Sequence, residues 1–220
     1  MDSDPKTPHF FGKKKVILFD FDGTIVDVLQ IFVEICNALA TTYAYPPIRQ
    51  EEIPLLKDKS AQEILRTRLR IPFWRLWGFL RRAHAEYRLR TDKISVFPEM
   101  KSLIGSLQSH GYTTGIVSAN SQEAIEILLH THNISFDFIQ SSGHWGKARV
   151  FNKIISQKHF EKKDVVYIGD EVHDAEACRK SGIKILAVTW GLNSKKALQE
   201  AGAQTVDTPR ELLDHFLAPD

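Results

Sequence analysis

Two aspartates follow directly after an apolar run near the start of the chain. Val16–Phe19 reads as a buried β-strand, and Asp20 and Asp22 come at its end with only Phe21 between them. Residues two apart on extended backbone point to the same side. Two carboxylates that are buried together repel each other and lose hydration. A hard divalent cation offsets both costs, so the pair predicts a Mg2+ site, because Mg2+ is usually held by one or two carboxylates and a substrate phosphate.

Gly23 and Thr24 come directly after Asp22. Glycine lets the backbone turn tightly, and such a turn aims its N–H groups at an anion. We therefore expect Gly23 and Thr24 to bind substrate phosphate. An Asp-Gly turn with a helix-capping aspartate is the structural alternative, and the apolar strand in front of the pair counts against it.

A second predicted strand, Thr113–Val117, ends at Ser118, Ala119 and Asn120. A hydroxyl group and backbone donors near the start of a helix suit a phosphate oxygen. We expect these three residues to bind phosphate. The alternative is that Ser118 is only a turn or helix-capping serine.

A third predicted strand, Val165–Ile168, ends at Gly169 and Asp170, and Asp174 follows four positions after Asp170. A spacing of four places both carboxylates on one side of a helical turn. Acids are also favoured at helix N-termini for electrostatic reasons alone, which is the alternative here.

A cluster of these carboxylates requires a positive side chain nearby. Lys147 stands ahead of a helix predicted over Val150–His159, between the second and third strand ends. Lys153 and Lys158 lie inside that helix and are the alternatives, and any of the three could be only a solvated charge.

Strands alternate with helices along most of the chain, which predicts a doubly wound parallel sheet with helices on both faces. Ligands bind beyond the carboxyl ends of the strands in such sheets. A fourth strand is expected over Ile183–Val188. The predicted helices of this part are Met100–His110, Gln122–His130, Val150–His159 and Ala175–Ser181.

Residues 28–95 differ from the alternating strands and helices of the rest of the chain. They show helical patterns over Leu29–Thr42, Ala61–Leu69 and Phe73–Arg90 and no convincing strand. We therefore expect a flexible arm over residues 1–12, an α/β core over 13–27 and 96–220, and a helical cap domain over 28–95.

Composition excludes several classes of protein. The chain has 220 residues, 43% of them hydrophobic and 25% charged, and a formal net charge of +2. We expect neither nucleic-acid nor membrane binding, because the net charge is small and no run reaches the ~18 apolar residues of a membrane span. Only Cys36 and Cys178 occur, and the N-terminus does not look like a secretory signal, so we expect a reduced, cytoplasmic protein.

Together these residues resemble the motifs of the haloacid dehalogenase-like hydrolase superfamily. Four motifs occur in order: Asp20-Phe21-Asp22-Gly23-Thr24, then Ser118, then Lys147, then Gly169-Asp170 with Asp174. The resemblance spans about residues 16–215 and implies a Rossmann-like core of this superfamily's type. The helical insert and the segment 188–212 are similar to those of phosphoglycolate phosphatase-like members.

The resemblance implies phosphoryl transfer through an aspartyl-phosphate. Asp20 would be the nucleophile and Asp22 the general acid and base, with the Asp22 backbone carbonyl on Mg2+. Members of the dehalogenase branch lack an aspartate two positions after the nucleophile, so Asp22 indicates phosphate chemistry.

The remaining motif residues would hold the phosphate and the metal ion. Ser118 and Lys147 would bind the transferring phosphoryl oxygens. Asp170 would be a direct metal ligand, and Asp174 would orient a metal-bound water or Lys147. The implied metal set is Asp20, Asp22, Asp170 and Asp174.

Two positions depart from the pattern of the superfamily. Ala148 follows Lys147 where these phosphatases usually have proline, and Glu171 follows Asp170 where serine or threonine is common. Glu171 is either an extra metal contact or a helix N-terminal acid, and we favour the second interpretation.

The insert is basic and aromatic. Residues 49–93 hold twelve lysines and arginines against six acids, so the insert either steers anionic substrates or is merely a solubilising surface. Lys57 and Lys59 lie where related caps send a loop to the active site, and we expect one or the other to touch the far end of the substrate. The insert's large apolar side chains indicate a core of its own or a subunit contact: Phe73, Trp74, Trp77, Phe79, Leu80 and Tyr87.

We therefore expect a Mg2+-dependent phosphomonoester hydrolase for a small phosphorylated metabolite, with phosphoglycolate as the best guess, in a monomer or homodimer. One alternative is a phosphomutase of the beta-phosphoglucomutase type. Others are phosphonate cleavage through a Schiff base on Lys57 or Lys59, and a non-catalytic binding module that uses the basic insert.

Overall fold

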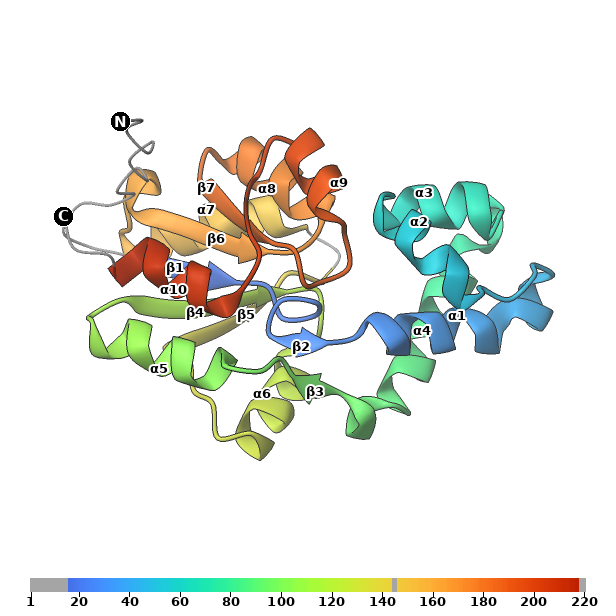
Figure 1. The fold of residues 1–220 in the computed structure, drawn as a ribbon, viewed down its shortest axis with the longest axis horizontal. Helices are drawn as coiled ribbons and strands as arrows, with labels where there is room; N and C mark the ends of the chain where they lie inside the picture. Colours follow the sequence, from blue (N-terminus) through green and yellow to red (C-terminus); the bar gives the residue numbers. More distant parts are fainter. Residues whose placement is uncertain (1–15, 144–145, 218–220) are drawn as a thin grey trace, which may run out of the picture.

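A six-stranded parallel sheet forms the centre of the protein (Figure 1). The computed structural model describes residues 16–143 and 146–217, so the arm expected over residues 1–12 lies outside the described part. The strand order is β5-β4-β1-β6-β7-β8. The strands are β1 (Val16–Phe19), β4 (Thr113–Ser118), β5 (Phe138–Ser141), β6 (Val165–Gly169), β7 (Lys184–Val188) and β8 (Gln204–Val206). The predicted doubly wound, Rossmann-like α/β fold is confirmed.

Both faces of β1 are buried. Val16 and Leu18 belong to one apolar cluster, and Ile17 and Phe19 to another on the opposite face. The first cluster includes residues of helices α7 (Lys147–Lys158) and α8 (Val172–Ser181), and the second includes residues of α5 (Met100–Ser109), α6 (Gln122–Thr131) and α10 (Pro209–Leu217). Double burial explains why this strand reads as an unbroken apolar run.

Several elements differ from their predicted bounds. The helix expected from Val150 begins at Lys147, and the helix expected from Ala175 begins at Val172. Helix α9 (Lys195–Glu200) follows β7, and β5 is an additional edge strand. Within residues 16–143 and 146–217, every helix is too short or too polar to cross a membrane.

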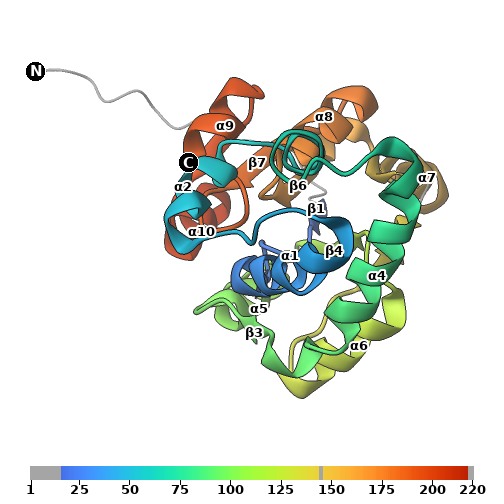
Figure 2. The ribbon, with the colours of Figure 1, turned by 90° about the vertical axis from the view of Figure 1, so that its right-hand side faces the viewer.

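The helical insert lies beyond the ends of the strands and faces the viewer in Figure 2. Its α-helices are α1 (Leu29–Tyr43), α2 (Ile53–Lys57), α3 (Ala61–Glu63) and α4 (Leu76–Arg88). It joins the core through β2 (Val26–Asp27) and β3 (Ser95–Val96), which pair antiparallel. The expectation of no strand over residues 28–95 is therefore wrong at Ser95, because a two-residue strand is too short to show a periodicity.

Two predicted helices of the insert are shorter than expected. The pattern over Ala61–Leu69 forms α3 and then a π-turn over Ile64–Arg68, where the Thr67 hydroxyl donates to the Glu63 carbonyl. Such side-chain bonds to the preceding turn bend helices. The pattern over Phe73–Arg90 starts as a 3-10 turn and becomes α-helical only at Leu76.

The aromatic side chains of the insert divide into two groups. Phe79 is buried and packs edge-on against Tyr43, with 5.1 Å between the ring centroids. Phe73, Trp74 and Trp77 are 83%, 78% and 70% exposed. The expectation of a core is wrong for these three, because they lie on the solvent side of the insert, and a subunit contact stays a prediction.

Part of the insert's basic charge is used to hold the insert together. Arg68 donates to Glu52 over 2.6 Å and to the carbonyls of Pro46 and Pro47. Arg90 donates to Glu86 over 2.5 Å. These two arginines are partners of acids and carbonyls within the insert, so they add little to substrate steering.

Candidate active site

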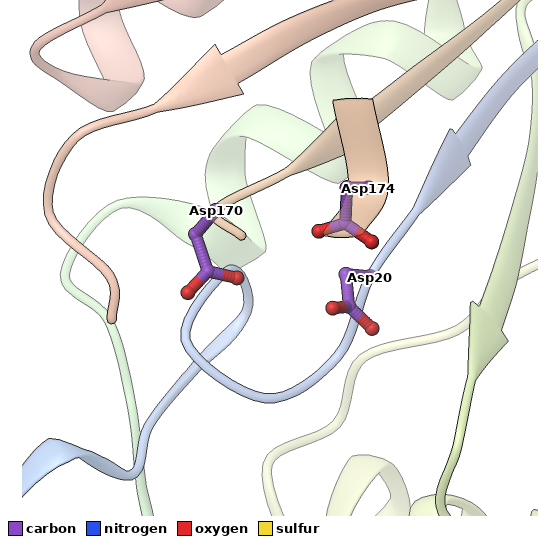
Figure 3. A group of neighbouring side chains, drawn as sticks. All are labelled: Asp20, Asp170 and Asp174. Carbon is purple, nitrogen blue, oxygen red and sulfur yellow. The ribbon is translucent and has the colours of Figure 1, made fainter. Parts of the chain in front are cut away.

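Three buried aspartates meet where β1 and β6 end (Figure 3). Carboxylate oxygens of Asp20, Asp170 and Asp174 all lie within 4.8 Å of one another. Asp20 extends β1, since its N–H donates to the Ile168 carbonyl over 2.8 Å, and Asp174 lies in the first turn of α8. Adjacent parallel strands end at one edge of the sheet, which is why residues 150 positions apart come together.

Burial makes this cluster electrostatically expensive. Burial raises the pKa of Asp20 to about 8, while Lys147 opposes that rise and Asp174 adds to it. Burial also raises the pKa of Asp170 well above its usual value, with a further contribution from Asp20. These buried carboxylate oxygens favour a positive charge between them. A hard divalent cation requires several oxygen ligands of this kind, so the three aspartates fit the expected Mg2+.

Lys147 is the positive side chain of the cluster. It is the first residue of α7, and its ammonium group donates to Asp20 Oδ2 over 2.6 Å and to Asp174 Oδ1 over 2.5 Å. Burial alone would lower the pKa of Lys147, but the two carboxylates raise it well above its ordinary value. The alternatives Lys153 and Lys158 are exposed.

Asp170 is held rigidly by its surroundings. Its Oδ1 accepts a hydrogen bond from the Thr24 hydroxyl over 2.8 Å, and its Oδ2 accepts one from the Leu192 N–H over 2.7 Å. A Cβ atom on Gly23 would lie 2.1 Å from Oδ2, and one on Gly191 would lie 2.3 Å from it. Leu192 and Gly191 were not foreseen, because only the folded chain brings them to Asp170.

One donor each of Gly23 and Thr24 is hydrogen-bonded within the protein. The Gly23 N–H donates to the Val26 carbonyl over 2.8 Å, and the Thr24 hydroxyl donates to Asp170. Gly23 has φ of +75°, which suits a residue without a side chain. This tight turn directs the Gly23 N–H to Val26 and the Thr24 hydroxyl to Asp170, and phosphate binding by these two residues stays a prediction.

Ser118 and Ala119 line an open cleft of about 600 Å³ together with Asp20, Asp22 and Lys147. Ser118 ends β4 and is 1% exposed. The cleft thus brings the predicted nucleophile, acid and phosphate-binding residues to one surface.

Asn120 makes hydrogen bonds to two other residues of the site. Its N–H donates to Ser118 Oγ over 3.3 Å, and its side-chain amide donates to Asp22 Oδ2 over 2.6 Å. These donors of Asn120 therefore hold Ser118 and Asp22, two residues that line the cleft, and phosphate binding by Asn120 stays a prediction.

The Asp22 side chain lies outside the group of three aspartates. Its Oδ1 accepts a hydrogen bond from the Tyr87 hydroxyl of α4 over 2.7 Å. Burial raises the pKa of Asp22 to about 6, and the hydrogen bond from Tyr87 opposes that rise. Tyr87 was expected only as a packing residue, because nothing in the sequence connects two residues 65 positions apart.

Lys57 and Lys59 lie beside the cleft. The side-chain amide of Asn193 donates to their carbonyls over 3.0 and 2.8 Å, which docks this loop of the insert on the core. Both lysines line a small, mostly apolar hollow of about 50 Å³, and Glu171 borders both this hollow and the cleft. Burial lowers the pKa of Lys57, while Asp170 opposes that change.

Glu171 is the N-cap residue of α8, and its N–H donates to Asp174 Oδ2 over 3.1 Å. This position agrees with a helix N-terminal acid. In the described residues the carboxylates close enough together to hold a cation are those of Asp20, Asp170 and Asp174, without Glu171.

Comparison with known proteins identifies the family. A model of the haloacid dehalogenase-like hydrolases matches residues 17–188. The chain belongs to this family. It is 32% identical to a phosphoglycolate phosphatase of Synechococcus elongatus over 90% of this chain and 95% of that protein. It is 24% identical to an N-acetylmuramic acid 6-phosphate phosphatase of Pseudomonas aeruginosa over 91% of this chain and 93% of that one.

A solved haloacid dehalogenase-like hydrolase of Streptococcus pneumoniae has the same fold, with a TM-score of 0.76 at 21% identity over 92% of this chain and 98% of that chain. The expected superfamily, its phosphoglycolate phosphatase-like branch and a phosphatase-type enzyme are confirmed by these matches.

Proposed function

We propose that the protein is a Mg2+-dependent phosphomonoester hydrolase that forms an aspartyl-phosphate on Asp20. The observation that carries the proposal is the convergence of Asp20, Lys147, Asp170 and Asp174 at one end of the sheet. Structural ion pairs are rarely so deeply buried or so rich in carboxylates, because the desolvation of each charge is costly.

In the first step an Asp20 carboxylate oxygen attacks phosphorus, and the bond between phosphorus and the ester oxygen breaks. Asp22 gives its proton to the departing oxygen, so that an alcohol leaves. Lys147 and the Ser118 hydroxyl would hold the phosphoryl oxygens, across which charge is spread in the transition state.

In the second step Asp22, now ionised, takes a proton from water. The water oxygen attacks phosphorus, the bond to Asp20 breaks, and inorganic phosphate leaves. The raised pKa of Asp22, about 6, suits a residue that must give and take a proton near neutral pH.

Asp20, Asp170 and the Asp22 backbone carbonyl would hold Mg2+, and Asp174 would position Lys147 and a water. When bound, the ion neutralises charge that the carboxylates and the phosphate bring together. Thr24, Leu192 and the two glycines around Asp170 keep that ligand in place.

The proposed substrate is a small phosphorylated metabolite, with phosphoglycolate as the first candidate because a phosphoglycolate phosphatase is 32% identical. Residues 28–95 would act as the cap over the core, and Lys57 or Lys59 would contact the far end of the substrate. The cytoplasmic location and a monomer or homodimer stay predictions.

Purified protein tests this function. Phosphate release from phosphoglycolate and a panel of phosphate monoesters should stop with EDTA, return with Mg2+, and vanish in Asp20→Asn. Activity that survives both treatments contradicts the proposal. A need for a bisphosphate primer, with transfer to a sugar in place of phosphate release, would instead indicate the phosphomutase.

A further inference from the structure

Both oxygens of the Asp22 carboxylate accept hydrogen bonds from donors that lie far away in the sequence. The Tyr87 hydroxyl donates to Oδ1 over 2.7 Å, and the Asn120 amide donates to Oδ2 over 2.6 Å. The same amide nitrogen lies 3.1 Å from the Tyr87 oxygen, to which it also donates. The three side chains therefore form a closed group.

The two donors come from different parts of the protein. Tyr87 belongs to α4 of the insert, whereas Asn120 follows β4 of the core. Helix α4 is held against α1 by the contact of Phe79 with Tyr43. The position of the Tyr87 hydroxyl is thus set by the packing of the insert. The hydroxyl reaches Asp22 only when the insert is docked, or seated, on the core.

A second polar contact between insert and core lies elsewhere. The Ser194 hydroxyl donates to the Asp58 carboxylate, and the Ser194 N–H donates to the Lys57 carbonyl over 2.8 Å. Seating of the insert therefore does not depend on Tyr87 alone, and the two contacts can be separated by mutation.

An acid that protonates a leaving oxygen must be aimed at it. A carboxyl group rotates readily about its terminal side-chain torsion. Hydrogen bonds to both oxygens fix that torsion, while each oxygen keeps a second lone pair for the transferred proton. Tyr87 and Asn120 together supply this restraint.

We propose that Tyr87 is a positioning residue for Asp22, which aims the carboxyl group for proton transfer once the insert is seated on the core. Tyr87 acts through Asp22 and does not touch the phosphoryl group. The inference rests on the proposed hydrolase function, and it makes proton transfer to the leaving group, rather than substrate binding, the step that the insert controls through this residue.

The test compares two leaving groups in Tyr87→Phe. An alkyl phosphate needs a proton on its departing oxygen, whereas p-nitrophenyl phosphate releases a stable anion without one. General acid catalysis typically raises the rate about 10²–10⁴-fold. Loss of one of the two hydrogen bonds that restrain Asp22 should lower this rate enhancement about tenfold. We expect kcat/KM to fall about tenfold for the alkyl phosphate and less than twofold for p-nitrophenyl phosphate.

Asp58→Ala is the matched control, because it removes one other hydrogen bond between insert and core, the one from the Ser194 hydroxyl, without touching Asp22. It should change kcat/KM for both substrates by the same factor. An equal fall for both substrates in Tyr87→Phe would mean that Tyr87 only holds the insert in place, which overturns the inference. No change for either substrate overturns it as well.

Asn120→Ala keeps the test decisive if Tyr87→Phe does not fold, as judged by circular dichroism. This variant removes the donor to Asp22 Oδ2 but keeps the backbone N–H that reaches Ser118. The same difference between substrates is expected, and its absence overturns the inference. An inactive wild-type protein refutes the hydrolase function and the inference with it, whereas an active one without the difference refutes the inference alone.

Discussion

The ammonium group of Lys147 lies 2.6 Å from the Oδ2 atom of Asp20, although 127 positions separate the two residues. The contact places a positive charge beside the proposed nucleophile and opposes the effect of burial on its pKa. Lys147 also reaches Asp174, so one lysine holds two carboxylates that would otherwise repel each other. Its loss should therefore affect both activity and stability.

Lys147→Met should lower kcat/KM about 10²–10³-fold, because a charged donor to the transferring phosphoryl group is lost. The midpoint of thermal unfolding should also fall, since Asp20 and Asp174 lose their buried partner. Steady-state kinetics and calorimetry check both effects. Lys153→Met, on the exposed side of the same helix, is the control, and an equal loss there would show that the lysine assignment is wrong.

Mg2+ should stabilise the folded protein. At a concentration of about 100 times its Kd, binding raises the free energy of unfolding by about 2.7 kcal/mol. Asp170→Asn should remove this gain, and in EDTA the variant should be at least as stable as the wild type, because a buried charge is gone. Thermal unfolding with and without Mg2+ checks this. Asp207→Asn, which removes a carboxylate paired with Lys195 outside the cluster, should keep the gain.

Gly191→Ala should disable the metal site without removing a ligand. The new methyl group would lie 2.3 Å from Asp170 Oδ2 and 2.4 Å from the Gly23 carbonyl oxygen, so Asp170 must move. We expect at least a tenfold fall in kcat and a loss of stabilisation by Mg2+. Gly105→Ala in α5 meets open space and should raise the free energy of unfolding by about 0.5–1 kcal/mol. Full activity in Gly191→Ala would contradict the close packing.

Acid should weaken the insert through Glu52. Its pKa is lowered to about 2 by the hydrogen bond from Arg68, against an ordinary value of 4.5. Because the folded value is the lower one, the pair contributes stability above pH 4.5 that is lost as the pH falls toward 2. Glu52→Gln should be less stable than wild type at pH 6, and the difference should shrink at pH 3, as measured by urea unfolding. Glu51→Gln, at an exposed neighbour without a bond to Arg68, is the control and should keep the stability of the wild type at pH 6.

Much of the core could be predicted because its strands are buried on both faces. Val16–Phe19 and Val165–Ile168 are short apolar runs for that reason. Strand β5 (Phe138–Ser141) escaped prediction, because it is a half-buried edge strand with polar residues in its second half. Strands β2 and β3 have two residues each, which is too few for any periodicity.

The direction of individual donors was harder to foresee. The Gly23 N–H points to Val26 and the Asn120 amide points to Asp22, although both residues were expected to face phosphate. The backbone angles of a turn decide where its N–H groups point, and those angles depend on what packs against the turn. At Gly23 the group that packs against the turn is the Asp170 carboxylate.

The sequence by itself determined which edge of the sheet carries the chemistry. Asp20 and Asp170 follow apolar strands, and parallel strands end at a common edge, so their meeting follows from local pattern and topology. Only the tertiary structure decided that Tyr87 of the insert reaches Asp22. That contact depends on how α4 packs on α1 and how the insert sits on the core, and no local periodicity encodes either.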